Sequence, residues 1–276
     1  MSKNAGKTTV LNHMLDHFKK ANLIVALTSL GRDGEDKDIV TGTVKPKIFV
    51  PKGSIIATAE ALLGLSDITS EILDVTNFNT PMGRIIITRA LSSGFVQIGG
   101  ASISCHLSET IETLKSYNID KIIIDGAINR KSSSNPLLAE AVVLCVGASL
   151  SSDMSEVIRR AKFAADILML PKADLKEEHI AITGAVTDTK ISNLLFSGEN
   201  LNGSQIICED PSKILISHDA YEKLTARGVI LAVKHTANLV AITINPMSAK
   251  GFCFQKDEFL NKLSKAVQVP VYNVCA

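Results

Sequence analysis

Hydrophobic residues along this chain gather in short continuous runs rich in Ile, Val and Leu, and longer amphipathic stretches separate them. Continuous apolar runs are typical of strands covered on both faces, whereas alternating runs are typical of strands with one wet face. The pattern predicts buried strands at 23–28, 84–88, 121–125, 141–146 and 167–170. We therefore expect a mainly parallel sheet.

The amphipathic stretches predict helices at 8–20, 107–117 and 155–165. Ser151, Ser152 and Asp153 come directly before the third stretch and are good helix-capping residues. A repeating order of strand and helix favours an α/β fold with helices on both faces of the sheet.

The segment at about 41–100 has a different character. Turn signals such as Lys45-Pro46 and Thr80-Pro81-Met82-Gly83 separate short strand-like runs, and one helical stretch is predicted near 57–63. We interpret this segment as an insertion that extends the sheet edge or covers the site.

Turn-forming residues cluster again at 196–203 and predict a domain boundary. The larger domain would span 1–198 and the smaller α/β domain 204–276. In the smaller domain we expect helices at 219–226 and 256–266, and strands at 214–216, 229–233, 239–244 and 269–274.

Composition narrows the functional classes. The 276 residues are 46% hydrophobic and 21% charged, which is enough apolar material for a sizeable core. A net charge of +1 provides no general attraction for nucleic acid or an anionic membrane. The five cysteines form no C-x-x-C pair, and we find neither a membrane-length apolar run nor a signal-peptide pattern. We therefore expect a cytoplasmic protein with reduced thiols.

The chemistry of the chain centres on Gly6-Lys7-Thr8-Thr9, which a helical pattern follows. Glycine lets backbone N–H groups approach a phosphate, lysine reaches the β and γ phosphates, and the neighbouring hydroxyl binds Mg²⁺. The N-terminus of the helix adds its positive dipole end. The pattern predicts that ATP binds here, with Thr8 as a ligand of Mg²⁺ and the loop formed by Asn4, Ala5, Gly6, Lys7, Thr8 and Thr9.

The phosphate-loop motif is incomplete. The pattern G-x-x-x-x-G-K-[ST] would place its first glycine at Met1, and a strand would precede that position. Either the start of the chain is truncated and the strand lies upstream, or the match is accidental. The surrounding residues at 2–5 and the following helix favour a phosphate loop.

Three acidic residues follow predicted strands and could act on the same phosphates. Asp125 ends the run Ile122-Ile123-Ile124, and carboxyl ends of strands are where open α/β sheets bind ligands, so we expect it to hold Mg²⁺. Asp33 and Asp36 lie in a glycine-containing loop, where they could order Mg²⁺ or the attacking water. An ordinary Asp-Gly turn and a solvated acidic turn are the alternatives.

The sequence at 2–9 resembles the phosphate loop of the dethiobiotin-synthetase and MinD-like branch of P-loop proteins. Within that branch the chain is similar, over nearly its whole length, to the nucleotide-binding subunit of the reactivase for adenosylcobalamin-dependent lysine 5,6-aminomutase. The similar stretches are 28–35, 51–60, 80–83, 124–132 and 146–149.

The resemblance implies a P-loop NTPase fold and an ATPase that, with Mg²⁺, drives the exchange of damaged cobalamin for fresh cofactor. Lys7 would bind phosphates, Thr8 and Asp125 would hold Mg²⁺, and Asp33 or Asp36 would sense hydrolysis. It also implies two partners, a second reactivase subunit and the aminomutase, while a homodimer stays open. No cobalamin-binding D-x-H-x-x-G motif occurs.

Two other functions fit the same residues. A ligase of the dethiobiotin-synthetase type would activate a small carboxylate or carbamate with ATP, but Lys45 is the only obvious basic residue to cover the phosphates. A P-loop regulator that does not hydrolyse nucleotide is the second alternative.

Overall fold

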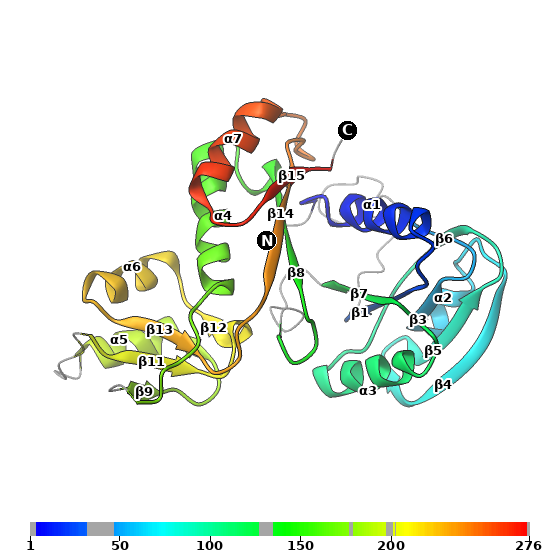
Figure 1. Ribbon diagram of the computed structural model, residues 1–276, viewed down its shortest axis with the longest axis horizontal. Coiled ribbons are helices and arrows are strands. Elements are labelled where there is room, and N and C mark those ends of the chain that lie inside the picture. Colours follow the sequence, from blue (N-terminus) through cyan, green and yellow to red (C-terminus); the bar gives the residue numbers. More distant parts are fainter. Residues whose placement is uncertain are drawn as a thin grey trace.

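The protein has an α/β fold. The computed structural model describes residues 4–31, 47–126, 135–176, 179–196, 201 and 203–274. Figure 1 shows two lobes joined by a middle layer in which helices α4 (Met154–Leu168) and α7 (Lys256–Ala266) lie beside a small sheet.

The first lobe contains a five-stranded mixed sheet with the order β4-β5-β3-β1-β7. Strands β3, β1 and β7 are parallel, whereas β5 is antiparallel to β3 and β4 is antiparallel to β5. The expectation of a mainly parallel sheet is therefore corrected for this lobe. The strands are β1 (Val25–Leu30), β3 (Ile55–Ala59), β4 (Ser70–Thr80), β5 (Gly83–Ala90) and β7 (Lys121–Gly126).

A tight turn explains the antiparallel pair. Thr80 pairs with Gly83, so that Pro81 and Met82 alone connect β4 to β5, and so short a connection can only reverse the chain. The run at 84–88 is buried as predicted, but it belongs to this hairpin.

Helices cover both faces of the five-stranded sheet. Val25 and Leu27 of β1 pack in one cluster with Leu11 and Leu15 of helix α1 (Lys7–Lys20). Ala26, which points to the opposite face, packs with Leu114 of helix α3 (Ser104–Lys115). Short helix α2 (Glu60–Leu63) follows β3 directly, and β2 (Ile48–Val50) pairs with β6 (Gly94–Val96).

The segment at 41–100 does more than extend an edge. Within its described part, β3 lies between β1 and β5 in the sheet. The helix predicted near 57–63 begins only at Glu60, because residues 57–59 complete β3.

A parallel sheet of three strands forms the middle layer, in the order β15-β14-β8. Its strands are β8 (Val142–Gly147), β14 (Leu239–Asn245) and β15 (Val271–Asn273). The 3₁₀ helix η2 (Ala148–Leu150) follows β8, and α4 and α7 pack on the sheet through Ala161, Phe259 and Leu263.

The run at 167–170 was predicted as a strand, and this prediction is wrong. Helix α4 continues to Leu168, and the N–H of Met169 still bonds to the carbonyl of Ala165. Buried Ala161 and Ala165 lie four residues apart on one helix face, so the apolar run is the buried end of a helix.

The second lobe has its own hydrophobic cluster, formed by residues between Ile167 and Val233. A parallel sheet β13-β11-β9 and a parallel pair β10-β12 surround it. Its elements are β9 (His179–Ala181), β10 (Val186–Thr187), α5 (Asp188–Phe196), β11 (Gln205–Cys208), η3 (Pro211–Lys213), β12 (Ile214–Leu215), α6 (His218–Ala226) and β13 (Ile230–Val233).

Strand pairing and packing both cross the residues near 200 where the sequence predicts a domain boundary. β8 pairs with β14, and the cluster of the second lobe takes residues from both sides of that position. Among the described residues, no helix combines the length and the apolar character needed to cross a lipid bilayer.

Phe259→Ala tests the packing of the middle layer. Phe259 is fully buried, so removal of its ring should lower the free energy of unfolding by about 3–5 kcal/mol. Phe196, which is 88% exposed, provides the control, and Phe196→Ala should change it by less than about 0.5 kcal/mol. Urea denaturation measures both, and equal effects would contradict this packing.

Candidate functional site

Helix α1 begins with a phosphate-loop-like turn. Gly6 is its N-cap residue and has φ +88°, and Asn4 has φ +60°. Such left-handed conformations are accessible to glycine and tolerated by asparagine. The first turn contains no acidic residue, and its N-cap residue, Gly6, has no side chain that could cap it. Since the first N–H groups of a helix have no acceptor within the helix, this end of α1 can receive an anion.

The ends of two parallel strands hold this turn. The Asn245 side-chain amide donates to the carbonyl of Asn4 at 3.2 Å, and Asn245 ends β14. At the end of β8, Gly147 lies so close that a Cβ there would be 2.7 Å from the Cα of Ala5. The turn therefore lies at the carboxyl ends of β8 and β14, the usual ligand edge of a parallel sheet.

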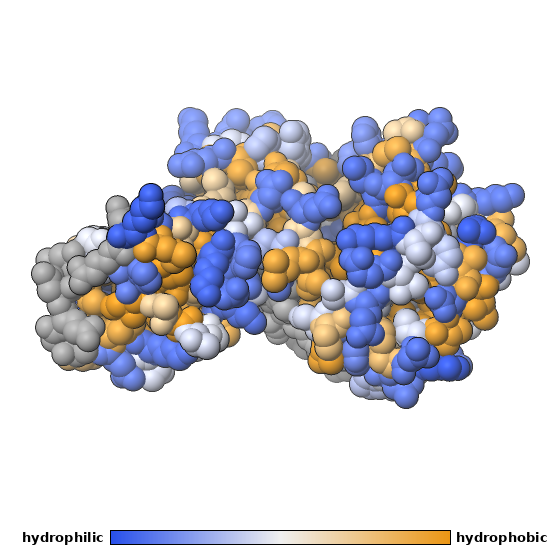
Figure 2. Space-filling view, turned by 60° about the horizontal axis from the view of Figure 1, so that its bottom comes forward, coloured by the Kyte–Doolittle hydropathy of each residue, from blue (hydrophilic) through white to orange (hydrophobic). Residues whose placement is uncertain are grey.

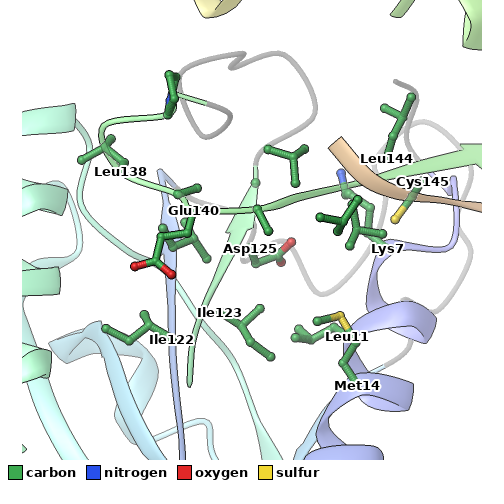
Figure 3. Close-up of a pocket in the computed structure, with 18 of the residues that line it drawn as sticks. Lys7, Leu11, Met14, Ile122, Ile123, Asp125, Leu138, Glu140, Leu144 and Cys145 are labelled. Carbon is green, nitrogen blue, oxygen red and sulfur yellow. The ribbon is translucent and has the colours of Figure 1, made fainter. Parts of the chain in front are cut away.

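Asp125 lies at the carboxyl end of β7, as expected. Its partner in the register is Ser29, the last residue but one of β1. Lys7, Asp125 and Cys145 line one cavity of about 960 Å³, and Figure 3 shows their side chains around the same part of it. The structure thus brings three of the predicted site residues, Ala5, Lys7 and Asp125, to one cavity.

The thiol of Cys145 is affected by both charges. Burial raises the pKa of Cys145, the positive charge of Lys7 lowers it in part, and the negative charge of Asp125 raises it further. A cation and a carboxylate therefore lie within electrostatic reach of one partly buried thiol. Lys7 could neutralise a phosphate, and a carboxylate such as Asp125 is a suitable ligand for Mg²⁺.

The other predicted residues fall into two groups. Thr8 and Thr9 lie in the first turn of α1 and are partly exposed. Asp33 and Asp36 lie outside the described residues, as does Lys45. Gly31 is the last described residue before them, and its N–H donates to the carbonyl of Ala101 at 2.7 Å.

Three residues that contribute to this site were not predicted as site residues, namely Cys145, Gly147 and Asn245. Each lies at or near the end of a predicted strand, where ligands of α/β sheets bind. Their position at strand ends could have identified them from the sequence as candidate site residues. The sequence does not show that β8 and β14 pair with each other, and this pairing brings Gly147 and Asn245 to the same loop.

The residues present fit a nucleoside triphosphate with Mg²⁺. The start of α1 at Gly6, the ammonium group of Lys7 and the close backbone approach at Gly6 suit phosphate oxygens, while Thr8 and Asp125 provide oxygen ligands for a hard cation.

Gly147→Ala tests the support of the loop. The added methyl group would overlap Ala5, so the loop must move, and the amide chemical shifts of Ala5, Gly6 and Lys7 should change. Gly64→Ala is the matched control, because a Cβ at Gly64 meets no atom within 4 Å. Backbone NMR measures both variants. Unchanged shifts in Gly147→Ala would contradict the contact.

We found no match to this chain among models of protein families, curated proteins or solved structures. The function of the site is therefore inferred from its own residues and their chemistry.

Proposed function

We propose that the chain binds ATP with Mg²⁺ at residues 4–9 and hydrolyses it, and that it serves as the nucleotide-binding subunit of a reactivating factor for an adenosylcobalamin-dependent aminomutase. The observation that carries the nucleotide proposal is the shared cavity of Lys7 and Asp125 beside the glycine-capped start of α1. In this proposal the fold is of the P-loop NTPase type and the protein works in the cytoplasm.

The proposed roles follow from the chemistry of each group. Backbone N–H groups at 6–9 and the Lys7 ammonium would hold the phosphates, and Thr8 with Asp125 would hold Mg²⁺. Mg²⁺ would neutralise charge that develops on the phosphate oxygens. Asp33 or Asp36 would orient the attacking water and respond to loss of the γ phosphate.

The arrangement of the site suggests how nucleotide could drive a conformational change. The turn at residues 4–6 is attached to the sheet of β8 and β14, whereas Asp125 belongs to the sheet of β1 and β7. A ligand that contacts both sheets stabilises the arrangement in which both sets of contacts are made. Hydrolysis removes some of these contacts, which is what a cofactor-exchange cycle requires of its nucleotide.

The resemblance of 28–35, 124–132 and other stretches to the lysine 5,6-aminomutase reactivase supports the choice of partner. The proposed complex contains this chain, a second reactivase subunit and the aminomutase. Exchange of damaged for fresh cobalamin would occur in that complex, on the aminomutase.

Lys7→Ala should weaken binding of a fluorescent ATP analogue at least about tenfold, because a charge-assisted hydrogen bond contributes about 1.5–3 kcal/mol. Lys7→Arg keeps the positive charge and should lose less. The matched control is Lys19→Ala, which removes an exposed lysine from the same helix. Fluorescence anisotropy with Mg²⁺ present measures all four proteins.

Equal binding by wild type and Lys7→Ala would show that the phosphate-loop proposal is wrong. If the wild type binds the analogue but never hydrolyses ATP, the chain is a non-hydrolysing regulator.

Asp125→Asn should remove most of the Mg²⁺ dependence of nucleotide binding, because the neutral amide is a poor ligand for this cation. The control is Asp67→Asn, which changes an exposed carboxylate far from α1 in the sequence. Titration of Mg²⁺ at fixed nucleotide measures the effect. Asp125 has no role in metal binding if the two variants respond to Mg²⁺ as the wild type does.

The reactivase role is tested with purified aminomutase that has been inactivated during turnover. Addition of this chain, the second subunit, fresh cofactor and Mg·ATP should restore mutase activity, and the Lys7→Ala protein should not. A small carboxylate that stimulates ATP turnover without any mutase would instead favour the ligase.

A further inference from the structure

The second lobe contains a parallel sheet of its own, formed by β9, β11 and β13 (Figure 1). Ligands of open α/β sheets bind outside the carboxyl ends of the strands. β13 ends at Val233, so Lys234, His235 and Thr236 follow it directly at this edge. Three consecutive polar residues therefore leave the sheet at the place where a ligand is expected, and the site of Lys7 and Asp125 does not use them.

A second lysine is held beside the end of β13 by backbone hydrogen bonds. Lys172 follows helix α4 in the chain and forms a parallel bridge with Val233. The N–H of Val233 donates to the carbonyl of Pro171 at 3.0 Å, and the N–H of Ala173 donates to the carbonyl of Val233 at 2.8 Å. Because these two bonds lie on either side of Lys172, its backbone is fixed next to the residues that follow β13.

These polar residues border a pocket of about 270 Å³, to which the segment before β8 adds two apolar residues. The described residues that line it are Pro136, Leu137, Lys172, Lys234, His235 and Thr236. None of these described lining residues is acidic. In the space-filling view, strongly hydrophilic residues lie between the hydrophobic surface of the second lobe and that in the middle of the molecule (Figure 2). The pocket therefore combines a basic side with a small apolar one.

One carboxylate outside the pocket holds two of its side chains. The Nζ of Lys234 donates to Oε2 of Glu209 at 3.1 Å, and the Nε2 of His235 lies 3.3 Å from its Oε1. The hydrogen bond from Lys234 lowers the pKa of Glu209, so this carboxylate stays ionised and keeps both side chains in place. Among the described residues, Lys172 has no ion-pair partner. The charge of Lys172 therefore remains available to a ligand.

We propose that this pocket binds the phosphate group of a small phosphate monoester. The ammonium groups of Lys172 and Lys234 neutralise the phosphate, and the side chains of His235 and Thr236 provide further hydrogen bonds. Lysine binds phosphate as a point charge, whereas planar carboxylates are typically recognised by arginine, and no arginine occurs among the described lining residues. The organic part of the ligand lies against the apolar side of the pocket, at residues 136–137.

The size of the pocket limits the length of the organic part. Its volume of about 270 Å³ is slightly below the range of small-molecule sites, which is about 300–1,000 Å³. A phosphate on a short carbon chain suits this volume better than a nucleotide does. The pocket and the cavity of Lys7 share Pro136 and Leu137 but no polar lining residue, so the two sites can be tested separately.

The experiment titrates butyl phosphate into the 276-residue chain at constant ionic strength and follows binding by backbone NMR. The amide signals of 172–173 and 234–236 should shift and saturate. Lys172→Gln should weaken binding at least about tenfold, because a hydrogen bond to a charged group is lost, and Lys172→Arg should lose less. The matched control is Lys223→Gln, which removes the same charge from an exposed position on α6 and should bind as the wild type does.

Inorganic phosphate and butyrate identify the chemistry that is recognised. Butyl phosphate should bind more tightly than inorganic phosphate, and Leu137→Ala should reduce that difference, since the butyl group contacts this side chain. Butyrate should bind at least about tenfold more weakly than butyl phosphate, because a phosphate carries more charge and more acceptor oxygens. Equally tight binding of butyrate would overturn the phosphate assignment. Equally tight binding of inorganic phosphate would overturn the assignment of an organic ligand.

Two further results would overturn the site itself. One is the absence of amide shifts at 172–173 and 234–236 with millimolar butyl phosphate. The other is equal weakening by Lys223→Gln and Lys172→Gln, which would show a general attraction of the lobe for anions. The Lys7→Ala protein should bind butyl phosphate at these residues as the wild type does, because Lys7 does not line this pocket. Failure of the nucleotide proposal therefore leaves the phosphate-monoester site standing.

Discussion

The contact of residues 4–6 with the ends of β8 and β14 is the interaction on which the candidate site depends. At Gly147 the two backbones approach so closely that no side chain fits between them, and Asn245 adds a hydrogen bond from the neighbouring strand. This contact attaches the start of α1 to the middle layer, while the body of α1 packs on the five-stranded sheet through Leu11 and Leu15. One short turn thereby links two sheets that share no strand pairing among the described residues.

The charges at the site come from separate parts of the fold, and the turn at residues 4–6 joins these parts. Lys7 follows the turn on α1, and Asp125 comes from β7, the edge strand of the other sheet that lines the cavity. The charges of Lys7 and Asp125 both influence the pKa of Cys145 on β8, in opposite directions.

Local sequence predicted most individual elements well, because their signals are short-range. The helix at 256–266 has the predicted bounds, and α1 begins within one residue of the expected position. The end of β7 near Asp125 could likewise be predicted, since an apolar run followed by Asp-Gly indicates where a strand stops. The error at 167–170 arose because a buried helix end and a short buried strand share the same apolar composition.

The long-range pairing could not be predicted. Nothing in the residues of β8 specifies β14 as its neighbour, and the support of the loop by Gly147 and Asn245 depends on that choice. The sequence also suggested a parallel sheet around 84–88, because apolar runs do not encode strand direction. Asp33 and Asp36 lie outside the described residues, so their role in the site stays a prediction.

The pairing of β8 with β14 has a consequence for how the chain is made. The whole second lobe lies between these strands in the sequence, and its own hydrophobic cluster gives it local contacts that can form first. Pairing across so long an intervening segment is entropically costly and should come late. During synthesis, Asn245 leaves the ribosome long after Asn4. The turn at residues 4–6 therefore acquires its support from β14 only after the whole second lobe has been synthesised.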